Sequence, residues 1–151
     1  MKIQNKKISI NHPPFIIAEI SANHNNSIKR TLRLVKEAKK AGADAIKLQT
    51  YKAESLTLNS HKSEFVINDK KSLWYKKSLF DLYKKGALPT SYYNEIFKEA
   101  KKNDIICFST PFDEESVDFL SKFKVPAFKI ASFENNHFPL IEKVISTKKP
   151  V

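Results

Sequence analysis

The sequence predicts an α/β fold, the N-terminal half of a TIM (β/α)8 barrel preceded by a short β-hairpin. Two observations predict it. Four apolar runs of strand length alternate along residues 15–151 with segments that repeat apolar residues at helical spacing, a pattern that favours right-handed crossovers and a parallel sheet. Polar or charged residues also fall within or directly after these runs, where parallel-sheet enzymes place their sites.

Residues 1–14 are expected to form the hairpin, and residues 15–151 the partial barrel with four strand–helix units. The stretch after Met1, KIQNKKISI, divides into two short strand-like parts around Asn5-Lys6. The last residues, Lys149-Pro150-Val151, resemble the approach to another strand. We therefore expect a barrel truncated before strand five.

The predicted strands cover residues 15–20, 45–49, 105–109 and 127–131. The first three are short, largely apolar and bounded by polar or turn-forming residues. The fourth, AFKIA, alternates as a strand should, with Lys129 at its centre. A lysine there is costly to bury unless an anion lies nearby, and the alternative is that its long stem carries the charge to solvent.

The predicted helices are recognised by their caps and by the spacing of apolar residues. Ser27 can cap a helix that runs to Ala41 and stops at Gly42. The segment from residue 50 to about 89 is longer than the usual loop between a strand and a helix. We expect a helix at residues 72–84 within it. Further helices are predicted at residues 90–102, from Asp113 through Phe123, and from Pro139 through Ile145.

Composition limits the functional classes. A chain of 151 residues fits one domain, and its apolar content of 41% is far above the disordered range. No apolar run reaches bilayer length and the N-terminus lacks the apolar stretch of a signal peptide, so we expect a cytoplasmic protein with no membrane partner. The only cysteine, Cys107, lies in a strand-like run and is interpreted as a buried, inert thiol.

The net charge of +11 comes from lysines spread over nearly every segment. This pattern is typical of a solvated surface rather than of a nucleic-acid interface, so no nucleic-acid partner is expected. A positive field would still favour the arrival of an anionic substrate. Only two glycines are present, which excludes a glycine-rich phosphate loop. Any phosphate must therefore be held by side chains and strand-end amides.

Three strands each place one charged residue, Glu19, Lys47 or Lys129, on the face opposite their large aliphatic residues. In a barrel the aliphatic face meets the helices and the other face lines the interior. Isolated charges there would each cost on the order of several kcal/mol. A doubly or triply charged anion bound beside them would compensate the charge of the two lysines. The alternative is a structural ion pair between Glu19 and one lysine, which leaves the other lysine unpaired.

Four segments carry a resemblance to a known family: FIIAEISANHNNS, GADAIKLQTY, FSTPFDEESVDFL and KIASFENNHFPLI. Together, and in this order, they resemble the N-terminal barrel of the sialic acid synthase family, the nonulosonic acid synthases. SFEN followed by Pro-Leu-Ile, and the strand end KLQTY, are most similar to the pseudaminic acid branch. The N-acetylneuraminate enzymes typically have glycine where Phe133 stands.

The resemblance implies a transferase that condenses phosphoenolpyruvate with the open-chain aldehyde of an acetamido sugar, giving a nine-carbon 2-keto acid and phosphate. For the pseudaminic acid branch the sugar is 2,4-diacetamido-2,4,6-trideoxy-L-altrose, and the alternatives are the precursors of N-acetylneuraminate and legionaminic acid. It further implies a divalent metal, Mn2+ or Mg2+, held by two histidines on later strands outside this chain. It implies a homodimer in which a C-terminal antifreeze-like domain reaches the partner's site. We expect the present chain alone to be inactive.

The resemblance also implies roles for particular residues. Lys47 and Lys129 would hold the phosphate and carboxylate of phosphoenolpyruvate, Glu19 would bind sugar hydroxyls, and Glu134 would act as general base toward the water that adds at C2. Thr110 and Ser132 would add hydrogen bonds. Tyr51 begins the long segment, which either covers the substrate or is a packing insertion. The remaining residues expected to line the site are Gln49, Asn23 and Asn135.

Two questions stay open. His24 could face the substrate or be satisfied by backbone groups. The other histidines, His12, His61 and His137, are scattered without ligand spacing, so no metal site is expected within this chain. From a different functional class, the chain could be a non-catalytic half barrel or assembly module, because an open parallel edge after the fourth strand invites pairing.

Overall fold

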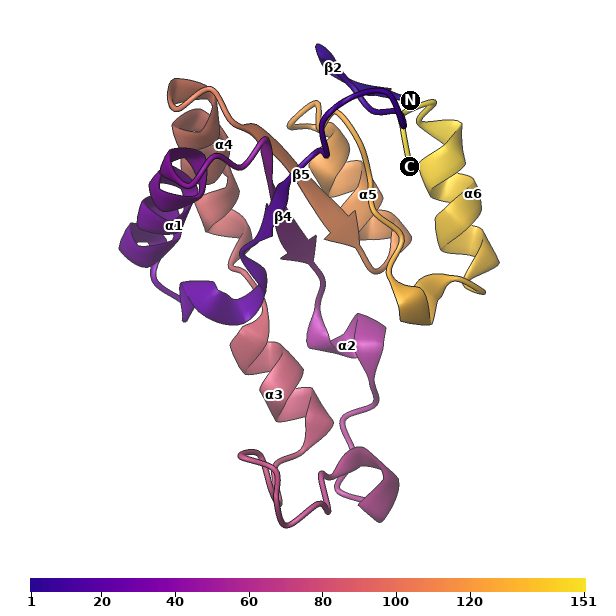
Figure 1. Cartoon of the computed structure of the whole chain (residues 1–151). Helices are drawn as coiled ribbons and strands as arrows, with labels where there is room; N and C mark the ends of the chain where they lie inside the picture. The colour runs from indigo at the N-terminus through magenta and orange to yellow at the C-terminus, as the bar shows by residue number, and fades with distance from the viewer.

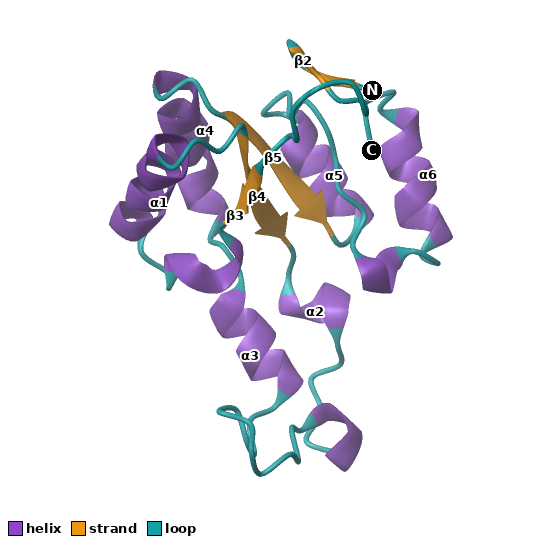
Figure 2. Cartoon of the chain, in the orientation of Figure 1, coloured by secondary structure: helices purple, strands orange, loops and turns teal.

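A computed structural model describes all 151 residues, and its centre is a parallel three-stranded sheet. The strands lie in chain order: β3 (Ile17–Glu19), β4 (Ala45–Thr50) and β5 (Ile106–Pro111). Residues 17–19 pair with 45–47, and residues 45–50 pair with 106–111. In Figures 1 and 2, α1 and α4 are seen to the left of the sheet and α5 and α6 to the right, and all four pack against the same face of the sheet. The predicted α/β class is confirmed.

The helices connect the strands as crossovers. The α-helices are α1 (Ile28–Lys40), α2 (Ala53–Leu56), α3 (Leu79–Gly86), α4 (Tyr93–Lys102), α5 (Glu114–Ser121) and α6 (Phe138–Ser146). Four 3-10 turns complete the chain: η1 (Ser21–His24), η2 (Ser63–Phe65), η3 (Thr90–Tyr92) and η4 (Ser132–Glu134). No helix is both long enough and apolar enough to cross a membrane.

The expected helix caps are present. The Ser27 side chain accepts a hydrogen bond from the Arg30 amide at 3.3 Å, and Asp113 accepts one from the Ser116 amide at 2.6 Å. Gly42 follows the end of α1 with φ +90°, a left-handed conformation that glycine adopts without a Cβ clash. These signals fix where α1 and α5 begin and where α1 ends.

A short antiparallel hairpin precedes the sheet, as predicted, with β1 (Lys2–Ile3) paired to β2 (Lys6–Lys7). Its buried side chain, Ile3, packs against residues on the inner face of the sheet, among them Ala45 and Phe108. The opposite face carries the main core. There Ile46 and Leu48 of β4 pack against helical residues such as Val35 of α1. The sheet is therefore buried on both faces, as a parallel sheet requires.

The helix predicted at residues 72–84 is wrong in its position, because α3 begins at Leu79. Ser78 caps it by accepting from the Asp81 amide at 3.1 Å. Residues 66–78 instead fold back on themselves: Val66 bridges Ser78 in antiparallel register, and the Lys76 amide donates to the Ile67 carbonyl at 2.8 Å. Backbone pairing and a strong cap therefore outweigh the weak helical spacing around Trp74, which is exposed.

The strand predicted at residues 127–131 is also wrong as a full strand. Phe128 forms a single parallel bridge with Ser109, and the Lys129 amide donates to the Ser109 carbonyl at 3.3 Å. On the other side, the Phe128 amide donates to the Pro150 carbonyl at 3.0 Å. The segment is extended between two neighbours but has one bond to each, so no ladder forms. The structure thus contains three strands of the expected four.

Candidate functional site

Glu19, Lys47 and Lys129 line one cavity of about 430 Å3. They come from β3, from β4 and from the extended segment beside β5. Glu19 lies directly opposite Lys47 in the parallel register, and Lys47 Nζ is 2.5 Å from Glu19 Oε1. Period-two side-chain alternation therefore places all three charges on the inner face of the sheet.

The charges in this cavity do not balance. The Lys47 side chain is only 8% exposed, whereas that of Glu19 is 56% exposed. Lys129 takes part in none of the ion pairs of the structure. The hydrogen bond from Lys47 lowers the pKa of Glu19, with a smaller contribution from the charge of Lys129. Among the side chains that line the cavity there are therefore two cations and one carboxylate, an excess of one positive charge.

The remaining wall of the cavity is almost entirely apolar. The N-terminal hairpin and the last residues of the chain supply much of it, although no charge pattern in the sequence pointed to them. A low-dielectric wall of this kind strengthens the interaction of the lysines with an anion. The apolar lining residues are Met1, Ile3, Ile17, Phe108, Ala127, Phe128, Ile130, Pro150 and Val151.

Gln49 and Thr110 face each other across β4 and β5 on the same side as Lys47. Gln49 is half-buried, and Thr110 is only 1% exposed. The Thr110 hydroxyl has no hydrogen-bond partner. A buried hydroxyl without a partner costs free energy unless another group, such as a bound anion or a water molecule, satisfies it.

Glu134 is the second buried group without a complete set of partners. It lies in η4 and is 8% exposed, and its Oε2 atom makes no hydrogen bond. Burial raises the pKa of this carboxyl group, and the positive charge of Lys129 partly opposes the rise. A carboxylate with a raised pKa is a stronger base than an ordinary one, as a general base requires. Its neighbours Ser132 and Asn135 are exposed.

His24 is held by backbone groups and does not face the cavity. It is 1% exposed, the Asn26 amide donates to its Nδ1 at 3.0 Å, and Nε2 lies 3.2 Å from the Gly86 carbonyl. Nδ1 must therefore be the acceptor and Nε2 the donor, which defines a neutral ring. Asn23, in the same η1 turn, is exposed, and its carbonyl accepts from Arg30 Nε at 2.6 Å.

Tyr51 packs against other aromatic rings at the base of the long segment. Its ring meets Tyr83 and Phe112 edge-on, at centroid distances of 6.1 Å and 5.4 Å. A Cβ atom added at Gly86 would lie 3.0 Å from the Tyr51 hydroxyl, so this glycine permits the close approach. The structure gives Tyr51 a packing role, and its contact with substrate stays a prediction.

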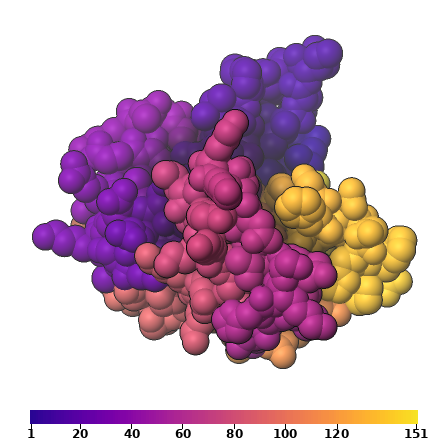
Figure 3. Space-filling view, turned by 90° about the horizontal axis from the view of Figure 1, so that it is seen from below, coloured from indigo at the N-terminus to yellow at the C-terminus, as the bar shows by residue number.

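The long segment, residues 50–89, lies over the carboxyl ends of the strands. Figure 3 looks onto this face, and the segment occupies its middle, between α1 and α6. Two contacts hold α2 to the N-terminus of α5: Lys52 pairs with Glu115, and Ser55 donates to Asp113. The segment is therefore anchored to the body beside the strand ends that carry Gln49 and Thr110.

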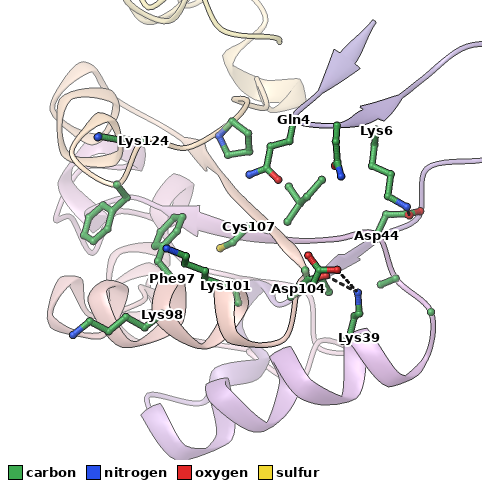
Figure 4. A pocket seen from close by; sticks show the side chains of 18 of the residues that line it. Gln4, Lys6, Lys39, Asp44, Phe97, Lys98, Lys101, Asp104, Cys107 and Lys124 are labelled. Carbon is green, nitrogen blue, oxygen red and sulfur yellow. Dashed lines mark hydrogen bonds and ion pairs between the residues drawn. The ribbon is translucent and has the colours of Figure 1, made fainter.

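A larger cavity of about 800 Å3 lies at the opposite, amino-terminal ends of β4 and β5 (Figure 4). Its two aspartates are already paired, Asp44 with Lys6 at 3.1 Å and Asp104 with Lys39 at 3.6 Å. Thr110 and Glu134 carry the only buried unpartnered side-chain atoms, and they line neither cavity. The smaller cavity is the better candidate site, because only it is lined by Glu19, Lys47 and Lys129.

No group of three or more histidine, cysteine, aspartate and glutamate side chains in this structure could hold a metal ion. The residues of this chain thus do not by themselves fit a metal site. Cys107, the only thiol, is buried, and burial raises its pKa. It lies in the wall of the larger cavity, away from Glu19 and the two lysines.

Comparisons with known proteins find relatives over most of the chain. The sequence model of the NeuB family matches residues 34–151. The chain is 49% identical to pseudaminic acid synthase of Campylobacter jejuni over 136 residues, 90% of this chain and 39% of that protein. It is 34% identical to N,N'-diacetyllegionaminic acid synthase of Legionella pneumophila over 138 residues, 91% of this chain and 38% of that protein.

A solved structure is similar over nearly the whole chain. It is the N-acetylneuraminic acid synthetase from Leptospira borgpetersenii in complex with citrate, with a TM-score of 0.80 and 28% identity. The match covers 97% of this chain and 46% of that one. The chain thus spans about 39% of the length of the curated relative from Campylobacter jejuni and somewhat less than half of this structure.

Proposed function

The chain belongs to the NeuB family, and we propose that it forms the phosphoenolpyruvate-binding part of a nonulosonic acid synthase. In this proposal the three parallel strands and the extended segment 127–131 correspond to the first half of a (β/α)8 barrel. The homologues include synthases of pseudaminic, legionaminic and sialic acids, so the broad reaction class is nonulosonic acid synthesis.

The observation that supports the proposal best is the charge imbalance of the 430 Å3 cavity. Phosphoenolpyruvate carries a phosphate and a carboxylate, and two lysines on neighbouring elements provide one cation for each. Lys47 is buried and already oriented by its ion pair, while Lys129 has no carboxylate partner. Cations held in an apolar wall bind an anion with little reorganisation, which favours tight and oriented binding.

The buried hydroxyl of Thr110 supports the same ligand. It lies at the end of β5 without a partner, and a phosphate or carboxylate oxygen would accept its hydrogen bond. Ser132, at the start of η4, is free to donate a further one. In the proposed arrangement Lys47, Thr110, Lys129 and Ser132 hold the anion, while Gln49, Asn23 and Asn135 line the space for the sugar.

The proposed chemistry joins C3 of phosphoenolpyruvate to the aldehyde carbon of the sugar. The electron pair of the enol double bond forms the new C–C bond, and the aldehyde oxygen takes up a proton. Positive charge develops at C2, where the carboxylates of Glu19 and Glu134 favour it. Water adds at C2 and gives up one proton to Glu134. The bond between C2 and the bridging phosphate oxygen then breaks, inorganic phosphate leaves with the electron pair of that bond, and the C2 hydroxyl loses the second water proton to become the 2-keto group.

The sugar is proposed to be 2,4-diacetamido-2,4,6-trideoxy-L-altrose, and the product pseudaminic acid. The chain is 49% identical to a pseudaminic acid synthase but 34% identical to a legionaminic acid synthase, which favours the pseudaminic acid branch. Synthesis of legionaminic acid or N-acetylneuraminate is the alternative. A divalent metal with ligands outside this chain, a homodimer, and the inactivity of this chain alone remain predictions.

The first test is a calorimetric titration of the 151-residue chain with phosphoenolpyruvate, with inorganic phosphate and 2-phosphoglycerate as controls. We expect saturable binding that is tighter for phosphoenolpyruvate and weakens with salt. Heats no larger for phosphoenolpyruvate than for phosphate would refute the proposal. A second titration, at saturating phosphoenolpyruvate, compares the three candidate sugars, and tightest binding of a legionaminic or neuraminic precursor would redirect the assignment.

A further inference from the structure

Three buried hydroxyl groups form a chain of hydrogen bonds between the sheet and α4. Thr50 Oγ1 lies 2.6 Å from Ser109 Oγ and 2.8 Å from the Tyr93 hydroxyl, which donates to the Gln49 carbonyl at 3.1 Å. Tyr93 and Ser109 are completely buried, and Thr50 is 5% exposed. We call Tyr93, Thr50 and Ser109 the hydroxyl network.

The direction of each hydrogen bond follows from proton counting. Tyr93 has one hydroxyl proton, and it goes to the Gln49 carbonyl. Tyr93 must therefore accept from Thr50, and Thr50 in turn must accept from Ser109. Each hydroxyl donates once, and the network ends on a backbone carbonyl of β4. All its oxygens are satisfied although no water is needed.

The network lies in a layer that is otherwise apolar. Tyr93 packs edge-on against Phe119 at a centroid distance of 4.9 Å and close to Phe123 at 5.9 Å. Burial raises the pKa of the Tyr93 hydroxyl, so it stays protonated. Buried polar groups in such a layer gain little net stability over apolar ones, but a fully satisfied network fixes one geometry.

The residues that this geometry fixes are those at the proposed site. Gln49 faces Thr110 at the carboxyl ends of β4 and β5, beside the proposed site. Ser109 is also the residue through which the extended segment joins the sheet, since its carbonyl accepts from the Lys129 amide. That segment has no ladder of its own, so the position of Lys129 depends on where Ser109 is held.

We propose that Tyr93, Thr50 and Ser109 are positioning residues that set the separation between Lys47 on β4 and Lys129 beside β5. They do not touch the ligand, and act through the backbone of Gln49 and Ser109. The proposal rests on the proposed function for its ligand, phosphoenolpyruvate. Its structural part, the coupling of the network to the Lys129 backbone, stands on the geometry alone.

The test compares Tyr93→Phe and Thr50→Val, which remove hydroxyls but keep shape, with Thr50→Ser, which keeps the hydroxyl. Tyr75→Phe is the matched control, because the Tyr75 hydroxyl makes none of the hydrogen bonds of the structure and lies in the distant 66–78 turn. The readouts are amide hydrogen exchange at Lys129, followed by NMR, and the dissociation constant for phosphoenolpyruvate, with urea unfolding to follow stability.

We expect Tyr93→Phe and Thr50→Val to speed exchange at the Lys129 amide and to weaken phosphoenolpyruvate binding by about five- to tenfold, the size of one hydrogen bond. Thr50→Ser and Tyr75→Phe should leave both within about twofold. Unchanged exchange at Lys129 in Tyr93→Phe and Thr50→Val would overturn the proposal, even if stability falls. Absence of phosphoenolpyruvate binding to the unmodified chain would instead refute the proposed function. The exchange rates would still show whether the hydroxyl network holds the Lys129 backbone in place.

Discussion

Replacing Glu19 with glutamine tests whether Glu19 and Lys47 form only a structural ion pair or belong to a site that binds an anion. In Glu19→Gln the carboxylate that faces Lys47 at 2.5 Å becomes neutral, while its size and hydrogen-bonding oxygen remain. If the cavity binds an anion, Glu19 competes with that anion for Lys47. The substitution should then lower the free energy of unfolding of the free protein and raise its affinity for phosphoenolpyruvate.

The expected magnitudes follow from exposure. Leaving one partner of a fully buried pair uncompensated costs about 3–5 kcal/mol, whereas an exposed pair is worth less than about 1 kcal/mol. Lys47 is 8% exposed and Glu19 56%, so we expect a loss of about 1–2 kcal/mol of unfolding free energy. Removing one negative charge near a bound trianion should tighten phosphoenolpyruvate binding by about tenfold, which corresponds to 1.4 kcal/mol.

The pH dependence of stability gives a second test of the pair between Glu19 and Lys47. Lys47 lowers the pKa of Glu19 below its ordinary 4.5, so the pair stabilises the fold above that pH. This contribution is lost as the pH falls through the lowered folded-state pKa. The stability difference between the unmodified chain and Glu19→Gln should therefore be constant at neutral pH and vanish in acid.

Urea unfolding and calorimetric titration measure the two effects of Glu19→Gln. Glu37→Gln is the matched control, since it breaks an exposed pair, Glu37 with Lys40 at 3.1 Å on α1. The control should change stability by less than about 0.5 kcal/mol and leave ligand binding unchanged. Lower stability of Glu19→Gln with no gain in phosphoenolpyruvate affinity would show that Glu19 and Lys47 form a purely structural pair.

Three further predictions concern the framework of the site. Burial lowers the pKa of His24, so stability should fall as the pH drops below about 6.5, and His24→Gln should remove this part of the urea-unfolding profile; an unchanged profile would contradict it. Gly86→Ala should destabilise by about 1 kcal/mol through its 3.0 Å approach to the Tyr51 hydroxyl, and a double-mutant cycle with Tyr51→Phe should recover part of the loss; additive losses would count against the contact. Asp113→Ala should cost about 1–2 kcal/mol in thermal unfolding by removing the α5 cap and the Ser55 contact, and a loss no greater than that of an exposed substitution would show that neither contact matters.

Elements with local physical signals could be predicted from the sequence. Ser27, Gly42 and Asp113 mark helix ends through hydrogen bonds and backbone conformations that involve only a few neighbouring residues. The side-chain alternation of a strand is equally local, so Glu19 and Lys47 could be placed on one face before their partner strands were known. Their shared cavity then followed from the parallel arrangement.

Elements that depend on distant partners could not be predicted in the same way. The segment around Lys129 has the composition of a strand, but a ladder needs several successive bonds to the same neighbour, and only single bonds to Ser109 and Pro150 form. The 66–78 turn forms through backbone pairing that side-chain spacing does not report. The hydroxyl network was also missed, because Tyr93 matched the apolar face of α4 and its hydroxyl partners lie on two strands far away in the sequence.

The hairpin shows a third limit. It was predicted as a separate unit, yet Met1 and Ile3 line the cavity that holds Glu19 and the two lysines. The two strand-like parts of KIQNKKISI predicted a hairpin, but nothing in them indicated against which surface it would pack. Packing partners between separate elements are set by tertiary structure, which local patterns do not specify.

Phosphoenolpyruvate binding by Lys129→Met is the most direct test of whether the 430 Å3 cavity binds this anion. This lysine takes part in none of the ion pairs of the structure, so its removal changes the charge of the cavity without breaking an ion pair. We predict that the dissociation constant rises at least about tenfold, while Lys101→Met, in the larger cavity, leaves it unchanged. Equal affinities of Lys129→Met and the unmodified chain would show that Lys129 does not bind the anion.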